Sequence, residues 1–290
     1  MACWVVKSRV CSTSRLNSWS KSMAKSSSVK IGGTGSATAS IRTSRIVKGS
    51  ADGTVCLVFL GSRVNRNTPV MIGANREESF RRPTTSPVCC RSGSIRCLVA
   101  GADHGPDGTF AEMGTWLGVN ESGLVVAVTN RRDGELRWED QIRSRGLLVI
   151  ALLGLDDPEQ AARLAEHALS QGGFGGSNFL IASPESALVV EAPGARRITI
   201  RAIEPGVHAV TNLDLDDEND ARISLVRENL DPAHFVTSAQ SLCRHEKIII
   251  AGAERGTVSS SLALVGSEIL LYHVLGNPNQ DVYRLYRLGL

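Results

Sequence analysis

The chain has 290 residues, of which 42% are hydrophobic and only 4% aromatic, which is enough apolar material for one large domain or two small ones. Its apolar run at residues 146–155 is shorter than the roughly 18 residues that a membrane-spanning helix needs, so we expect no membrane span. Residues 1–54 hold nine of the 32 basic residues but one of the 29 acidic ones. Residues 55–290 therefore carry a net charge of −5, which argues against a nucleic-acid-binding surface.

Residues 1–54 differ in composition from the rest of the chain. They are rich in Ser, Lys and Arg, contain one acid, Asp52, and show no helical or strand periodicity, so they bury too little apolar surface to offset the entropy of ordering. A transit peptide, a disordered arm and translation from an upstream start are three interpretations. We favour the upstream start, because Val55, whose codon can initiate in bacteria, directly precedes Cys56. The predicted organisation is a leader, residues 1–54, and one domain, residues 55–290.

The first half of the domain is predicted to consist of short strands. Asn120-Glu121-Ser122-Gly123 separates two of them and is typical of a hairpin turn. The strands expected here are residues 56–62, 70–74, 97–100, 115–120 and 124–129.

Helices and a second group of strands follow. Asp157 before Pro158 is typical of a helix N-terminus, and Gly172-Gly173 ends the Ala/Leu spacing that runs to Gln171. Two more helices are expected at residues 217–230 and 232–244. The remaining strands are expected at residues 178–182, 187–191, 197–202, 208–210, 258–265 and 268–274. Groups of strands alternating with groups of helices predict an α+β fold, a four-layer αββα sandwich of two antiparallel sheets between helical layers.

Cys56, at the start of the first predicted strand, is the main candidate for catalysis. A cysteine that is the first residue of a mature chain can pass its thiol proton to its own α-amine, because the two pKa values lie near 8.5 and 7.7–8.0. An internal Cys56 has no such amine. From its spacing alone, an ordinary buried cysteine is the more common explanation.

Three polar segments could complete such a site. Asn75-Arg76-Glu77-Glu78 follows the second predicted strand, where a solvated turn is the usual explanation, although Arg can also bind a carboxylate or an oxyanion. Asn130 and Asn212 each end an apolar strand after a Thr, and their amides are of the kind that stabilises an oxyanion. Both asparagines are also common turn residues.

The cysteines and histidines do not predict a metal site or a triad. The seven cysteines lack paired spacing, and Cys89, Cys90 and Cys97 match no zinc pattern, so reduced strand cysteines in a cytoplasmic protein are expected. The six histidines are scattered.

Taken together, the motifs resemble the NRDE family, also called the transport-and-Golgi-organisation protein family. The resemblance spans about residues 55–275, and its initial Met-Cys corresponds to Val55-Cys56, although Glu77 stands where the family has Asp. The matching blocks are Ala74-Asn75-Arg76-Glu77-Glu78, Gly114-Thr115-Trp116-Leu117-Gly118-Val119-Asn120, Thr211-Asn212-Leu213 and Arg255-Gly256-Thr257-Val258-Ser259-Ser260. That family is thought to share the N-terminal-nucleophile hydrolase fold of penicillin V acylases and bile salt hydrolases. The resemblance to those enzymes also covers Asn120-Glu121-Ser122-Gly123-Leu124 leading to Asn130.

The resemblance implies an amidohydrolase acting on a small-molecule amide. Cys56 would be the nucleophile, and Asn130 and Asn212 would stabilise the oxyanion. We expect Asn75, Arg76, Glu77 and Trp116 to contact the substrate, with no metal and no cofactor. The alternative is a non-catalytic carrier of haem or another metabolite, in which Cys56 would be an axial ligand.

Overall fold

The computed structural model describes residues 56–82, 84–102, 114–136 and 140–289, all within the compact unit Gly53–Leu290. The leader proposed for residues 1–54 lies outside the described residues and stays a prediction.

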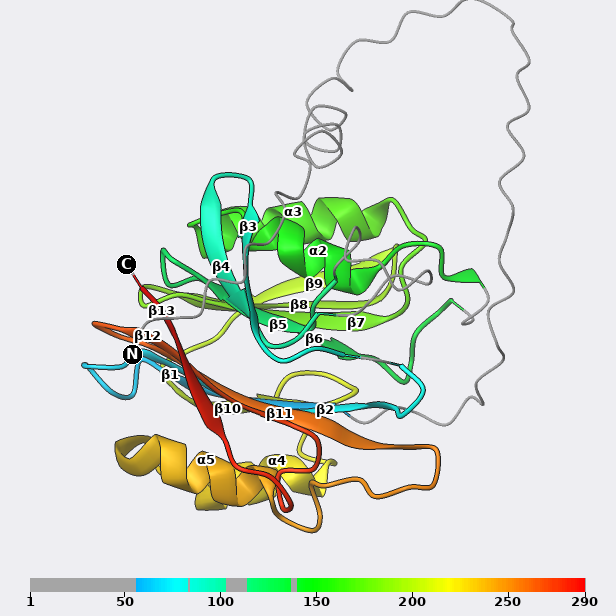
Figure 1. The fold of residues 1–290 in the computed structure, drawn as a ribbon. Coiled ribbons are helices and arrows are strands. Elements are labelled where there is room, and N and C mark those ends of the chain that lie inside the picture. Colours follow the sequence, from blue (N-terminus) through cyan, green and yellow to red (C-terminus); the bar gives the residue numbers. More distant parts are fainter. Residues whose placement is uncertain (1–55, 83, 103–113, 137–139, 290) are drawn as a thin grey trace, which may run out of the picture. The chain divides into compact units, whose positions relative to one another are not determined.

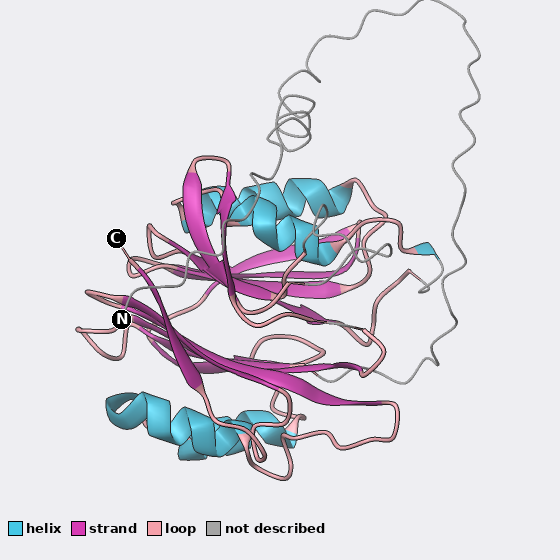
Figure 2. Cartoon of the chain, in the orientation of Figure 1, coloured by secondary structure: helices cyan, strands magenta, loops and turns pink. Residues whose placement is uncertain are grey.

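Two antiparallel sheets lie face to face, and each is covered on its outer side by helices, as Figures 1 and 2 show. The first sheet has the strand order β10-β1-β2-β11-β12-β13 and the second β3-β4-β5-β6-β7-β8-β9. We call them sheet 1 and sheet 2. The predicted αββα sandwich is confirmed. In none of the helices described here is there an apolar stretch of the length a membrane crossing requires.

Sheet 1 is formed by β1 (Leu57–Ser62), β2 (Val70–Ser79), β10 (Gly206–Val210), β11 (Arg255–Val265), β12 (Ile269–Leu275) and β13 (Arg284–Leu288). Sheet 2 is formed by β3 (Val88–Ser92), β4 (Ile95–Val99), β5 (Leu117–Asn120), β6 (Val125–Asn130), β7 (Ser177–Ala182), β8 (Ala187–Gly194) and β9 (Arg197–Ala202). The helices are α2 (Arg145–Leu152), α3 (Pro158–Ser170), α4 (Ala221–Asn229), the short 3-10 helix η3 (Pro232–His234) and α5 (Phe235–Cys243).

Helices α4 and α5 cover sheet 1. Phe235, Ala239 and Leu242 of α5 share an apolar cluster with Leu57 and Phe59 of β1, and all five side chains are buried. This cluster identifies the face of sheet 1 that packs against the helices. Odd-numbered side chains of β1 point to the helices, so even-numbered ones point toward sheet 2.

Helices α2 and α3 cover sheet 2, and α3 begins as its sequence predicts. The Asp157 carboxylate accepts the backbone N–H of Gln160 at 2.8 Å, with Pro158 in the first turn. The predicted turn between β5 and β6 is also confirmed, since the Gly123 N–H donates to the Asn120 carbonyl at 3.0 Å. Gly123 has φ +84°, a conformation that residues with a Cβ rarely adopt.

Several elements differ from the predicted set, and helix α4 begins at Ala221 rather than at residue 217. Strands β3 and β13 and helix α2 were not expected, and β2 continues to Ser79 rather than ending at residue 74. The last difference matters most, because it puts the polar segment Asn75-Arg76-Glu77-Glu78 inside a strand. The prediction failed because the apolar run ends at Ala74, whereas the polar residues after it are buried by contacts from other parts of the chain.

Candidate functional site

Cys56 lies immediately before β1, in the middle of sheet 1. β1 pairs with β2 on one side, where Leu57 faces Asn75, and with β10 on the other, where Val58 faces Val210. Continuing these registers to Cys56 places Arg76 on one side of it and Asn212 on the other. The sequence separates these three residues widely, and the sheet brings them into one row.

The alternation of β2 divides the predicted polar segment between two faces. Asn75 and Glu77 share the face of Leu57 and Phe59, which α4 and α5 cover. Arg76 and Glu78 share the face of Cys56, which looks toward sheet 2. We call these the helix face and the inter-sheet face. The structure therefore brings Arg76 to Cys56 and directs the Asn75 and Glu77 side chains away from it.

The Cys56 thiol is enclosed, with 7% of the residue exposed. Burial raises the pKa of Cys56, and the carboxylate of Glu77 raises it further, whereas a hydrogen bond from the Glu77 backbone and the charge of Arg76 lower it. The net direction is upward. In this environment the thiol stays protonated at neutral pH, so a nucleophilic Cys56 needs a nearby proton acceptor.

Glu78 organises the arginines on the inter-sheet face. Its carboxylate lies 2.8 Å from Arg82, 3.5 Å from Arg76 and 3.6 Å from Arg255. Burial raises the pKa of Glu78, but the charges of these arginines, Arg82 first, and the backbone N–H of Ser79 outweigh it and lower the pKa. An ionised Glu78 thus fixes the Arg76 guanidinium beside Cys56.

Asn212 links the two sheets at this end of the sandwich. Its side-chain amide donates to the main-chain carbonyl of Asn130 at 2.9 Å, and the main-chain carbonyl of Asn212 accepts the N–H of Arg132 at 2.9 Å. Asn130 is the last residue of β6 and pairs with Ser177 of β7. The structure therefore brings the two predicted oxyanion donors together, with the Asn212 side chain meeting the Asn130 main chain.

The Asn130 side chain belongs to the other face of sheet 2. Gly118 approaches Leu153, just after α2, and pairs with Val126, so Val126 and Asn130 share the face that α2 covers. Asn178, on the opposite face, donates to the carbonyl of Leu213 at 2.8 Å.

Arg131 holds the two loops that carry Asn130 and Asn212. Its side chain, 3% exposed, contacts Asp133 at 2.8 Å, Asp214 at 2.7 Å and the Asn178 side-chain oxygen at 2.9 Å. The chain segments after β6 and after β10 are thus tied to one guanidinium. This role was missed in the sequence, where Arg131 is only the residue after Asn130.

Trp116 and Asn120 are anchored within sheet 2. The Trp116 indole N–H donates to the Ala100 carbonyl at 3.0 Å, and 9% of the residue is exposed. The Asn120 side chain accepts the N–H groups of Ser122 and Leu124 and donates to the carbonyls of Leu153 and Leu155. Asn120 is therefore a structural residue of the hairpin. A contact between Trp116 and a substrate stays a prediction.

Arg145, the first residue of α2, is a site residue that the sequence did not reveal. Burial lowers the pKa of Arg145, while the nearby charges of Cys56 and Glu78 raise it and that of Arg82 lowers it. Its guanidinium therefore lies within electrostatic reach of the nucleophile candidate. No motif surrounds this residue, and α2 itself was not predicted.

A second polar cluster lies on the helix face, behind Cys56. Asn75 donates to the Cys243 carbonyl at 2.9 Å, and the Glu77 carboxyl accepts the hydroxyl of Thr257 at 3.0 Å. Both residues are buried, and one oxygen of each, Asn75 Oδ1 and Glu77 Oε2, has no hydrogen-bond partner among the residues that the structure describes. Burial raises the pKa of Glu77 to about 8, against smaller opposing effects of Thr257, Arg222 and Arg76. Glu77 is therefore largely neutral at pH 7.

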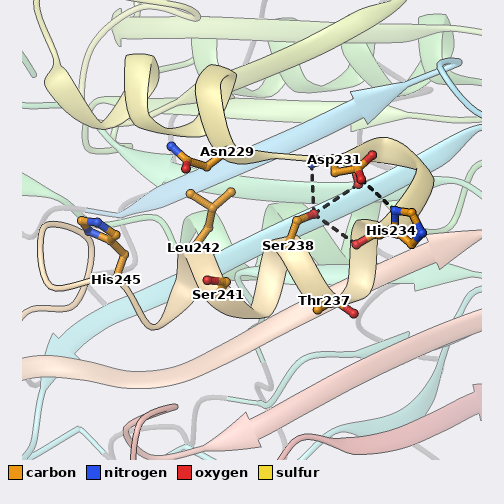
Figure 3. Close-up of a pocket in the computed structure, with 8 residues that line it drawn as sticks. All are labelled: Asn229, Asp231, His234, Thr237, Ser238, Ser241, Leu242 and His245. Carbon is orange, nitrogen blue, oxygen red and sulfur yellow. Dashed lines mark hydrogen bonds and ion pairs between the residues drawn. The ribbon is translucent and has the colours of Figure 1, made fainter.

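A groove lies along the outer side of α5, as Figure 3 shows. Its polar side chains serve the helix ends: Asp231 accepts the N–H of Ala233 at 2.9 Å and contacts His234 at 2.8 Å, and Ser238 donates to the Asp231 carbonyl at 3.2 Å. Because α5 covers the helix face, this groove is separate from the Cys56 side chain.

The haem alternative finds no support in this geometry. The charged and polar residues Arg76, Glu78 and Asn212 surround a thiol that is 7% exposed, which does not fit a porphyrin bound through Cys56. Within the described residues, no three His, Cys, Asp or Glu side chains are grouped as metal ligands would be. Haem carriage stays a prediction without a supporting observation.

Comparisons with known proteins show which family the chain is similar to. The family described as "Transport and Golgi organisation 2" matches residues 55–248. The human "Transport and Golgi organization protein 2 homolog" is 29% identical over 139 residues, which cover 46% of this chain and 47% of that protein. The chain thus aligns with about half the length of this relative.

Among solved structures, the chain is similar to penicillin V acylase from Agrobacterium tumefaciens, with 13% identity and a TM-score of 0.48 over 81% of this chain and 86% of that one. It is also similar to the Caenorhabditis elegans ortholog of N-acylethanolamine-hydrolyzing acid amidase, with 17% identity and a TM-score of 0.43 over 81% of this chain and all of that one.

Proposed function

The chain belongs to the Transport and Golgi organisation 2 family, and we propose that it is an amidohydrolase. Its nucleophile is Cys56, which lies immediately before β1 and is exposed as the first residue of the mature chain. The substrate is a small-molecule amide. The observation that carries the proposal is the row formed by Cys56, Arg76 and Asn212 on the inter-sheet face.

The α-amine of a mature Cys56 supplies the proton acceptor that the thiol needs. Burial raises the pKa of the Cys56 thiol, so few thiolates form without a base. An α-amine on the same residue takes the proton and later returns it to the leaving amine. The sulfur attacks the carbonyl carbon, the C–N bond breaks, and water then hydrolyses the thioester.

The oxyanion of the tetrahedral intermediate is stabilised by the Asn212 amide. The hydrogen bond to the Asn130 carbonyl at 2.9 Å orients this amide in advance, and a donor held in place is worth about 10²–10³ in rate. Arg76, fixed by Glu78, adds positive charge on the other side of Cys56. Asn130 contributes through its main-chain carbonyl, because its side chain belongs to the face that α2 covers. We propose the cytoplasm as the compartment, since Cys56, Cys97 and Cys243 are free thiols.

The test compares three preparations: residues 56–290 released with Cys56 at the N-terminus, the same chain with one Ala before Cys56, and residues 1–290. Each is incubated with a panel of fluorogenic N-acyl amides, and intact mass spectrometry searches for an acyl adduct. We expect hydrolysis and an adduct on Cys56 with the first preparation, and at least a 10³-fold lower rate with the second. Equal rates for both, or neither hydrolysis nor adduct with the first, would contradict the proposal.

A further inference from the structure

Arg145 is held at the same end of the sandwich as Asn130. Its Nη1 donates to the carbonyl of Gly176 at 3.0 Å, and that carbonyl also accepts the backbone N–H of Arg131 at 3.0 Å. Gly176 directly precedes Ser177, which pairs with Asn130. The Arg145 guanidinium therefore lies where β6 ends and β7 begins, and it interacts electrostatically with Cys56 and Glu78.

The charge of Arg145 is not balanced as the charges of its neighbours are. Arg131 has Asp133 and Asp214 as ion-pair partners, and Glu78 has three arginines. In the described part of the chain, Arg145 forms no ion pair, and its bond to Gly176 is with a neutral carbonyl. A half-buried guanidinium has lost part of its hydration, and Arg145 has no carboxylate among the described residues to compensate for this loss. An incoming anion would supply that compensation.

The guanidinium fork matches one class of anion well. Arginine presents planar N–H donors that bind both oxygens of a carboxylate. The two arginines also come from different layers, since Arg145 begins α2 on the side of sheet 2 and Arg76 lies in β2 of sheet 1, so a substrate lying over Cys56 could meet a cation from each layer.

We propose that Arg145 binds a carboxylate of the substrate, so that the amides processed at Cys56 carry a carboxylate close to the scissile bond. This rests on the proposed function. Arg145 is then a specificity residue, and its loss weakens the binding of anionic ligands more than that of neutral ones.

The test uses two alkylating reagents of nearly equal size on the full chain, iodoacetate and iodoacetamide, which differ in the carboxylate. The rate of each at Cys56 is measured by mass spectrometry of the peptide that contains it, and the exposed Cys89 serves as an internal reference. The matched control is Arg143→Gln, which removes an equal charge two residues away, where the guanidinium lies 4.5 Å over the Phe174 ring.

We expect the iodoacetate-to-iodoacetamide rate ratio at Cys56 to exceed that at Cys89 about tenfold, the effect of one favourable charge pairing of about 1.4 kcal/mol. Arg145→Gln removes this preference, Arg145→Lys keeps part of it, and Arg143→Gln leaves it unchanged. A ratio equal to that at Cys89, an equal loss in Arg143→Gln, or no labelling of Cys56 by either reagent would overturn the proposal.

Turnover separates this inference from the proposed function. With the chain that begins at Cys56, we expect N-benzoylglycine or N-succinyl amides to be hydrolysed with a KM about tenfold below that of the matching N-benzoylglycinamide or N-acetyl amides, a difference lost in Arg145→Gln. The two arms place the carboxylate on the leaving amine or on the acyl group, and a preference in either supports the proposal. If Cys56 reacts preferentially with iodoacetate but no amide is hydrolysed, the amidase proposal is wrong and the Arg145 proposal stands. If amides are hydrolysed without any preference for a carboxylate, the Arg145 proposal is wrong and the amidase proposal stands.

Discussion

The two faces of sheet 1 hold similar residue types in different chemical settings. On the inter-sheet face, Cys56 lies beside Arg76, and Glu78 is kept ionised by its arginines. On the helix face, Cys243 is buried, and Glu77 is largely neutral at pH 7 because burial outweighs its few charged neighbours. The comparison teaches that the face of sheet 1 on which a thiol or a carboxyl lies decides whether it can take part in chemistry or only in structure. Cys243 reaches the helix face from the end of α5, whereas Glu77 and Glu78 lie on opposite sides of β2.

Substitution of the two cysteines gives the sharpest contrast. In the chain that begins at Cys56, Cys56→Ser lowers kcat on the order of 10³-fold or more, because the weaker nucleophile replaces the thiol. Cys243→Ser keeps kcat within threefold but lowers the free energy of unfolding by about 1–3 kcal/mol, because a buried hydroxyl replaces the thiol. Steady-state kinetics and urea unfolding measure the two effects. Equal losses of kcat in Cys56→Ser and Cys243→Ser would contradict the division of catalytic and structural roles between the two faces.

Two buried asparagines make the next comparison, Asn75 within β2 and Asn212 after β10. Asn212→Ala removes the amide that is oriented toward Asn130, so we expect kcat to fall about 10²–10³-fold. Asn75→Ala leaves the Cys243 carbonyl without its donor and destabilises the fold by about 1–3 kcal/mol, with kcat changed less than tenfold. A KM increase alone in Asn212→Ala would assign this residue to binding instead.

The pH dependence of stability tests the neutral state of Glu77. Its pKa is raised to about 8 in the folded protein from an ordinary value near 4.5, so the folded state binds the proton more tightly. The stability from this group is complete below pH 4.5 and is lost as the pH rises to 8, by at most about 1.4 kcal/mol per pH unit. Glu77→Gln, which cannot ionise, is expected to flatten this slope in urea unfolding between pH 5 and 8; an unchanged slope would contradict it.

His273, on the inter-sheet face, should act in the opposite direction. Its ring accepts or donates a hydrogen bond with Ser261 at 2.8 Å, and burial lowers its pKa to about 4. The unfolded chain takes up the proton first, so stability is present above pH 6.5 and is lost as the pH falls toward 4, again by at most about 1.4 kcal/mol per unit. In His273→Gln the loss between pH 6.5 and 4 should be smaller than in the unsubstituted protein, and equal losses would sink this explanation.

The sequence predicted the layers of this fold better than the environment of its polar residues. Apolar periodicity and turn residues located most strands and the helix Pro158–Ser170, because both signals are local. The environment of Glu77 depends on its hydrogen bond with Thr257 and on the charge of Arg222, far along the chain, and no local pattern predicts them.

The candidate site was predicted in part. Cys56, Arg76 and Asn212 were named from their motifs, and the sheet brings them into one row. Arg145 was missed because it stands in a short helix without a motif. Asn75 and Glu77 were expected at the substrate from the family motif, and the continuation of β2 to Ser79 directs their side chains to the helix face instead. Consecutive side chains point to opposite faces in a strand but not in a turn. The position of the end of β2 therefore determines that Arg76, and not Asn75 or Glu77, lies beside Cys56.

The alternation of side chains along β2 also determines where residues can be inserted or deleted without loss of the site. The hairpin loop at residues 63–69 is closed by the N–H of Arg63 and the carbonyl of Pro69, and extra residues between these two leave both strands in register. One residue gained or lost within β2 before Arg76 would exchange the faces, turning Arg76 and Glu78 toward the helices and a neutral carboxyl toward Cys56. Relatives that keep this chemistry can therefore differ freely in the loop, whereas a single codon inserted into the strand would remove the site at once.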